Sequence, residues 1–165
     1  MTAKEYNDEV RLWADDAMRF AVRCGGSHAD SQDAVQEALV SLWHRHEAVD
    51  FANGKRYLMG AVYRSLMSLF RHRRVVRMHA EATQAIADNA VQPDERFDVR
   101  EAVEYSLGTL PEVQRAILQL RDVEGYSYAE IGEALSIDVD RVQVYLFRAR
   151  VAMRKQLKSM GYGSN

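Results

Sequence analysis

The 165-residue chain has a single cysteine, Cys24, and only two prolines. One thiol cannot form an intramolecular disulfide, so we expect a fold held together by packing and a reducing compartment. No apolar run approaches the roughly 20 residues that span a bilayer. Residues 1–10 also lack the apolar core of a signal peptide. We therefore expect a cytoplasmic protein without membrane insertion.

The sequence also lacks sustained alternation of polar and apolar residues, so strands are not expected. It has no glycine-rich phosphate loop and no convincing pair of nucleophile and base. His44 and His46 diverge on a helix, which disfavours a shared metal ion. We therefore expect neither an enzyme nor a bound cofactor or metal, and we interpret Cys24, at the end of an apolar stripe, as a buried packing residue.

The chain does contain two basic blocks, although its formal net charge is only −2. Residues 55–79 hold seven Lys or Arg and no Asp or Glu, and residues 139–160 hold six Lys or Arg against one Asp. Each block is joined to an apolar helical stripe. A solvated helix face would explain one such block, but two of them favour contact with nucleic acid.

Apolar residues recur at helical spacing over most of the chain, which predicts an all-α fold made of two small helical bundles. The first helix is expected over about residues 5–24. Asp30 or Ser31 is expected to cap the second helix. A loop over residues 47–54 then precedes a third helix that begins near Lys55.

The composition changes between residues 80 and 98, where the sequence is acidic, alanine-rich and contains a proline. This change predicts a flexible linker over 80–98 that joins a domain over 1–79 to a domain over 99–165. Early in the second domain, Thr109 and Glu112 are spaced to form a capping box at a helix start.

Residues 128–150 have the pattern of a helix-turn-helix, in which two short helices cross at a tight turn. Gly132 provides the small residue needed where the helices approach, and Ser136 lies at the turn. The second helix has one apolar side and one side with long donors, which suits the major groove of DNA. A helical hairpin with a charged outer face would have the same pattern. The candidate DNA-reading residues of this helix are Arg141, Gln143, Val144, Tyr145 and Arg148.

The sequence resembles a known family in three segments. Residues 110–157 resemble the C-terminal promoter-binding domain of bacterial extracytoplasmic-function (ECF, group IV) sigma factors. Residues 33–45, DAVQEALVSLWHR, resemble the polymerase-binding helix of that family, and residues 55–74, KRYLMGAVYRSLMSLFRHRR, resemble the helix that faces the promoter −10 region. The matches lie in the family's order and together cover nearly the whole chain.

The resemblance implies a sigma factor, which is not an enzyme but binds RNA polymerase core and directs promoter recognition and transcription initiation. Residues 1–79 would form the region 2-like domain, which binds the core and the −10 element. Residues 99–165 would form the region 4-like domain, which binds the −35 element. The linker over 80–98 would run near the polymerase active-site channel, where its acidity could mimic nucleic acid; a plain spacer is the alternative.

The implied partners are polymerase core, through its β′ clamp helices and β flap, and promoter DNA. An anti-sigma factor is a further candidate partner. Two other interpretations remain open. A helix-turn-helix regulator could act without core polymerase and use its N-terminal bundle to dimerise or sense a ligand. A nucleic-acid enzyme is disfavoured because no catalytic cluster appears.

The resemblance also assigns candidate residues. The residues assigned to core binding lie off the apolar stripe of their helix: Asp33, Gln36, Glu37 and Val40. The alternative is that they only form the solvent-exposed face of that helix. Capture of a −10 base falls to Phe51 and Asn53, in the loop before the basic helix, although Phe51 could instead anchor that loop to the core. Phosphate contacts fall to the cations of the basic helix: Lys55, Arg56, Arg64, Arg71, Arg73 and Arg74. Trp43 is expected in the core, because aromatic residues at helical spacing usually pack.

Overall fold

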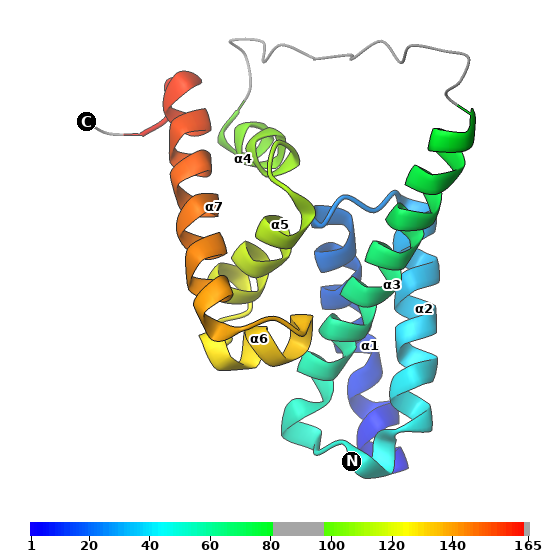
Figure 1. Cartoon of the computed structure of the whole chain (residues 1–165). Helices are drawn as coiled ribbons and strands as arrows, with labels where there is room; N and C mark the ends of the chain where they lie inside the picture. The colour runs from blue at the N-terminus through cyan, green and yellow to red at the C-terminus, as the bar shows by residue number, and fades with distance from the viewer. Residues whose placement is uncertain (81–97, 164–165) are drawn as a thin grey trace.

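The structure is a computed structural model that describes residues 1–80 and 98–163, and these residues are all-α, as predicted (Figure 1). The helices are α1 (Ala3–Arg23), α2 (His28–His44), α3 (Phe51–Ala80), α4 (Val99–Gly108), α5 (Glu112–Leu118), α6 (Tyr128–Leu135) and α7 (Val139–Ser159). A 3-10 turn, η1 (His46–Ala48), precedes α3, and a π-helical turn, η2 (Gln119–Val123), extends α5. The predicted linker lies outside the described residues except for its two ends. Among the described helices, none combines the length and apolarity that crossing a membrane requires.

Helices α1, α2 and α3 form the first bundle, and each buries one apolar face. The face of α3 consists mainly of Leu58, Val62 and Leu66, all fully buried. Cys24, just after α1, is also fully buried, and this burial raises the pKa of its thiol. The apolar stripe beside the first basic block and the burial of Cys24 were therefore predicted correctly.

The start of α2 differs from the prediction. Ser27 caps the helix, and its hydroxyl accepts a hydrogen bond of 3.1 Å from the backbone N–H of Asp30. Asp30 and Ser31 lie inside the helix and are buried. The Asp30 carboxylate accepts two hydrogen bonds of 2.6 Å from Arg73 of α3, and this pairing lowers its pKa. The carboxylate that was expected to cap α2 therefore binds α2 to α3 instead.

The prediction of a loop over residues 47–54 is also wrong, because η1 and the first turn of α3 occupy most of this segment. Two contacts hold this segment against α1. The ring of Phe51 packs 5.6 Å from that of Trp13, measured between centroids, and the N-terminal amine of Met1 donates a hydrogen bond of 2.7 Å to the carbonyl of Val49. These contacts stabilise the segment, so α3 begins at Phe51 and not near Lys55 as the sequence predicts.

The second bundle consists of α4 to α7. The capping box predicted for Thr109 and Glu112 does not form, because Pro111 occupies the N-cap position of α5. Thr109 belongs to the end of α4, where its hydroxyl donates a hydrogen bond of 2.7 Å to the carbonyl of Ser106.

Helices α6 and α7 form the predicted helix-turn-helix. Helix α6 begins with a capping box in which Ser127 and Glu130 exchange two hydrogen bonds of 3.1 Å. Ser136 ends the helix in the left-handed region, with φ of +57°. A Cβ added at Gly132 would lie 2.7 Å from the carbonyl oxygen of Ile137, so the crossing leaves no room for a side chain there.

The two bundles pack against each other. Helix α6 lies across α3, while α4 and α5 contact α1 (Figure 1). The buried apolar residues of both halves form one continuous cluster. The sequence patterns did not predict this contact.

We expect Gly132→Ala to lower the free energy of unfolding by about 1–3 kcal/mol, because the new methyl group must displace the backbone carbonyl of Ile137. Urea unfolding followed by circular dichroism measures the change. Gly108→Ala is the matched control: nothing lies within 4 Å of its added Cβ, and alanine favours the helix, so its stability should be unchanged or higher. Equal stability of the two variants would contradict the tight crossing.

Candidate nucleic-acid and polymerase interfaces

Helix α7 presents most of its predicted reading residues to solvent. Val142, Leu146 and Ala149 are buried on the other side of the helix. Tyr145 is half-buried and packs against the core cluster, so it lies at the edge of the exposed face. The predicted residues that are exposed are Arg141, Gln143, Val144 and Arg148.

The sequence prediction omitted Phe147, although its side chain is 70% exposed. It lies between Val144 and Val151, both 44% exposed, at spacings of three and four residues. That spacing, opposite the buried stripe, is the signal that could have identified it. The outer face of α7 therefore combines apolar side chains, which suit thymine methyl groups, with donors that suit base edges.

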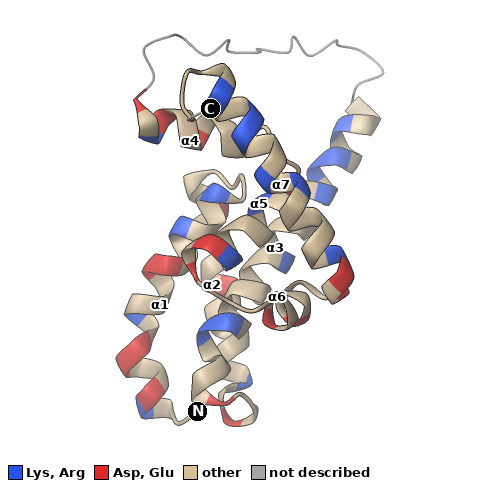
Figure 2. Ribbon diagram, turned by 90° about the vertical axis from the view of Figure 1, so that its left-hand side faces the viewer, with Lys and Arg blue, Asp and Glu red and all other residues tan. Residues whose placement is uncertain are grey.

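The C-terminal part of α7 carries further cations, visible as blue bands in Figure 2. Arg150 donates a hydrogen bond of 2.6 Å to Asp122, and this contact raises the pKa of the guanidinium. Arg154, Lys155 and Lys158 are exposed and form no ion pair with any described residue. These three cations are free to contact phosphates.

Helix α2 exposes a second surface. All four residues predicted to bind the core lie on it: Asp33, Gln36, Glu37 and Val40. Val40 is 55% exposed, and the Glu37 carboxylate accepts a hydrogen bond of 2.8 Å from Ser65 of α3. This surface is polar at its N-terminal end and apolar near Val40.

Trp43 extends the same surface, so the prediction that it lies in the core is wrong. Its side chain is 40% exposed, because the neighbouring Leu42 occupies the core position. The ring stacks on His46 at 4.5 Å between centroids, and the Tyr6 ring lies 5.0 Å away. An aromatic ring held in this way, but still accessible, resembles the anchors of protein interfaces.

The cations of α3 are mostly occupied by contacts within the chain. Lys55 binds Asp16 of α1 at 2.6 Å and Glu124 at 2.8 Å. These two carboxylates raise the pKa of Lys55 although burial opposes its charge. Among the six predicted phosphate contacts, those with a partner in the structure are Lys55, Arg56, Arg64 and Arg73. Arg71 and Arg74 are exposed and form no ion pair with a described residue.

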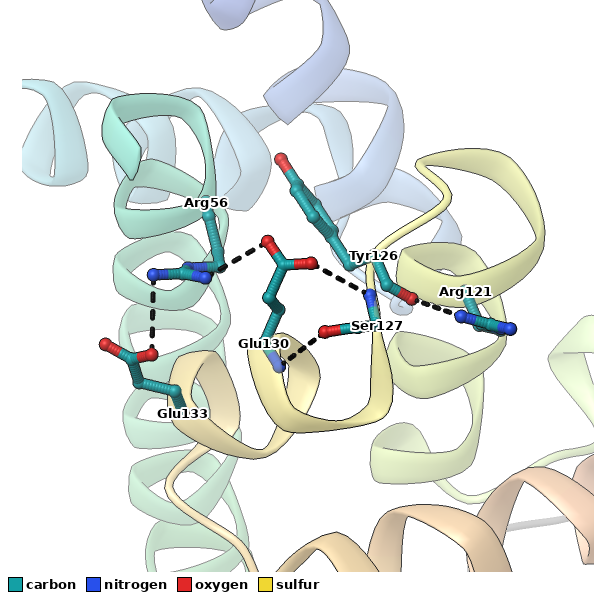
Figure 3. A network of polar contacts seen from close by, with 6 residues as sticks. All are labelled: Arg56, Arg121, Tyr126, Ser127, Glu130 and Glu133. Carbon is teal, nitrogen blue, oxygen red and sulfur yellow. Dashed lines mark hydrogen bonds and ion pairs between the residues drawn. The ribbon is translucent and has the colours of Figure 1, made fainter. Parts of the chain in front are cut away.

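Arg56 and Arg64 contact the C-terminal bundle (Figure 3). Arg56 lies between Glu130, at 3.1 Å, and Glu133, at 3.3 Å, and only 14% of its side chain is exposed. Arg64 donates a hydrogen bond of 3.2 Å to the carbonyl of Ala134.

A cavity of about 330 Å³ brings three predicted residues together: Asn53, Arg56 and Arg64. Glu133 and Ala134 of α6 also line it. Phe51 does not line this cavity. Its ring packs against Trp13, as expected of a residue that anchors this segment to the core. Its side chain is also 42% exposed, as capture of a −10 base would require. Tyr57 lines the cavity too, although the sequence prediction did not select it.

Residues 1–80 and 98–163 offer little other chemistry. They contain no group of three or more His, Cys, Asp or Glu residues that could hold a metal ion. Cys24 is buried with a raised pKa, so it is a poor nucleophile. The described residues thus present two open surfaces, on α2 and α7, and one partly covered surface on α3.

Comparisons with known proteins agree with this geometry. Residues 100–153 match the family described as Sigma-70, region 4. The ECF RNA polymerase sigma factor SigW of Bacillus subtilis is 24% identical over 94% of this chain and 90% of its own length. SigL of Mycobacterium tuberculosis is 29% identical over 87% of this chain and 83% of its own. SigE of Mycolicibacterium smegmatis is 27% identical over 92% of this chain, which spans 61% of that longer protein.

The fold is shared with the sigma factor RpoE of Bartonella quintana, whose structure was solved in complex with the anti-sigma factor NepR. The two chains superpose with a TM-score of 0.76 and 21% identity, over 94% of this chain and 98% of the other. Residues 100–153 are therefore a sigma-70 region 4 domain, in a chain whose relatives over most of its length are ECF RNA polymerase sigma factors.

Proposed function

We propose that this chain is an ECF sigma factor of group IV, which binds RNA polymerase core and directs it to promoters. The observation that carries the proposal is a region 4 domain whose recognition face on α7 is exposed, joined in one chain to the separate open surface of α2. A regulator that acts without polymerase would not need the surface of α2. Since its work would be with core polymerase, we expect it to act in the cytoplasm.

In this proposal the surface of α2 binds the β′ clamp helices of the core. Asp33, Gln36 and Glu37 provide hydrogen-bonding groups, while Val40 provides apolar area. Trp43 adds an aromatic ring at the end of the same surface. A mixed surface with a central apolar group and an aromatic anchor is typical of protein interfaces of moderate size.

The outer face of α7 would read the −35 element in the major groove. Arg141 and Gln143 lie near the N-terminus of the helix, where recognition helices approach base edges. Arg148 lies further along, and its planar guanidinium can donate two hydrogen bonds to guanine. The exposed cations beyond it would bind phosphates and fix the register.

The basic face of α3 would bind the −10 strand. Asn53 could hydrogen-bond a base edge, and Tyr57 offers a ring on which a base could stack. The cations of the helix would neutralise phosphates. An anti-sigma factor is a further proposed partner, because the structurally similar RpoE of Bartonella quintana was solved bound to one.

Run-off transcription tests the proposal. Purified core polymerase plus this chain should initiate on members of a promoter library that core alone leaves silent. Stable, sequence-specific DNA binding by the free chain without transcription would contradict the proposal and favour a regulator.

We expect Val40→Asp to weaken binding to core polymerase about tenfold, because it introduces a charge at the apolar centre of the α2 surface. Fluorescence anisotropy with labelled chain measures the affinity. Leu12→Asp is the matched control: Leu12 is 65% exposed on α1, outside the proposed interface, so its affinity should not change. Equal affinities for the two variants would remove α2 from the interface.

We expect Arg148→Ala to reduce run-off transcription from the best library promoter about tenfold and to relax the base preference within its −35 element, because a bidentate contact to a base is lost. Arg11→Ala, an exposed arginine on α1, is the control for loss of one charge. A loss of activity without any change in base preference would show that Arg148 contacts only phosphates.

A further inference from the structure

The basic face of α3 is covered by the C-terminal half of the same chain. Arg56 lies between the carboxylates of Glu130 and Glu133 on α6, and little of its side chain remains exposed (Figure 3). Lys55 reaches Glu124, just before α6, as well as Asp16. Two of the cations expected to bind a nucleic-acid strand, Lys55 and Arg56, therefore bind protein carboxylates.

The backbone of α6 also approaches α3 closely. Arg64 donates a hydrogen bond of 3.2 Å to the carbonyl of Ala134. A Cβ added at Gly60 would lie only 2.6 Å from that carbonyl oxygen. The lack of a side chain at Gly60 is thus what allows α6 to rest on the basic helix.

The segment that carries these carboxylates is itself well ordered by local contacts. Arg121 donates a hydrogen bond of 2.9 Å to the carbonyl of Tyr126 (Figure 3). Its guanidinium also lies 4.7 Å above the ring of Tyr128. Glu130 closes the capping box of α6, and its hydrogen bonds with Ser127, together with Arg56, lower its pKa. The carboxylate is consequently charged at neutral pH and held in place before it meets Arg56.

We infer that α6 and the segment before it act as an internal competitor that occupies the nucleic-acid surface of α3 with Glu124, Glu130 and Glu133. A DNA strand and α6 cannot use the same donors at once, so strand binding requires the two halves of the chain to separate at this contact. The inference rests on the proposed function, because it assigns strand binding to α3. It adds that the free chain conceals this site within itself.

The strength of the competition follows from the exposure of its groups. Glu130 and Glu133 are partly exposed, at 41% and 73% of their side chains, so each ion pair is screened by solvent. The contact is nevertheless intramolecular, which gives α6 a high effective concentration at α3. We therefore expect the covered state to dominate in the free chain but to yield to binding partners.

Two independent variants should uncover α3. The double variant Glu130→Gln with Glu133→Gln removes both charges facing Arg56, while glutamine at position 130 can still complete the capping box. Gly60→Ala inserts a methyl group against the carbonyl of Ala134, although alanine favours α3 itself. We expect each to bind fluorescein-labelled single-stranded DNA of mixed sequence about three- to tenfold more tightly than the unmodified chain does.

Matched controls exclude general effects. Asp8→Asn with Asp15→Asn removes the same two charges from exposed positions on α1, and Gly108→Ala adds the same methyl group where nothing lies within 4 Å. Neither control should gain affinity. A gain in the controls equal to that in the test variants, no gain in either test variant, or no strand binding by any variant would each overturn the inference.

Run-off transcription with core polymerase, performed on the same preparations, keeps this test separate from that of the proposed function. Transcription by all variants without a gain in strand affinity discards the internal competition alone. Failure of the unmodified chain to support transcription discards the proposed function.

Discussion

The apolar stripe of α3 is fully buried against α1 and α2, and this burial determines where the other side of the helix points. Leu58, Val62 and Leu66 lie in the core, so Arg56 and Arg64 are directed away from it. That direction leads to α6, whose carboxylates and terminal carbonyl receive the two guanidinium groups (Figure 3). The relation between the two halves of the chain follows largely from the packing of this one helix.

The same packing divides the functional surfaces into two kinds. The surface of α2 and the outer face of α7 remain open, and they carry the groups we assign to core polymerase and to the −35 element. The basic face of α3 is closed by contacts that partners could replace, because carboxylates and DNA phosphates satisfy the same donors. A chain with these properties would meet the polymerase first through its open surfaces.

Much of this arrangement was predictable from local patterns. Helical periodicity identified the all-α fold, the buried stripe of α3 and the helix-turn-helix with Gly132 at its crossing, because each depends on residues near one another in sequence. Helix ends were less predictable. Ser27 rather than Asp30 caps α2, since the Asp30 carboxylate finds a stronger partner in Arg73, far along the chain.

The other errors concern the placement of single side chains and contacts between distant residues. Trp43 remains half-exposed because Leu42 takes its place in the core, and Phe51 lies in α3 and leans on Trp13. The pairing of Arg56 with Glu130 and Glu133 joins helices that periodicity treats separately. A pattern of charges shows that such a helix is basic, but it does not show which carboxylates the fold will bring to it.

The central claim is that α3 exchanges α6 for DNA when the chain works. Pulsed electron–electron double resonance tests it directly by measuring the distance between nitroxide labels on Lys4→Cys in α1 and Lys155→Cys in α7. Both positions are exposed and accept labels, whereas the native Cys24 is buried. The free chain should give one well-defined distance, and addition of core polymerase with promoter DNA should replace it with a different one. An unchanged distance in a complex that initiates transcription would contradict the claim.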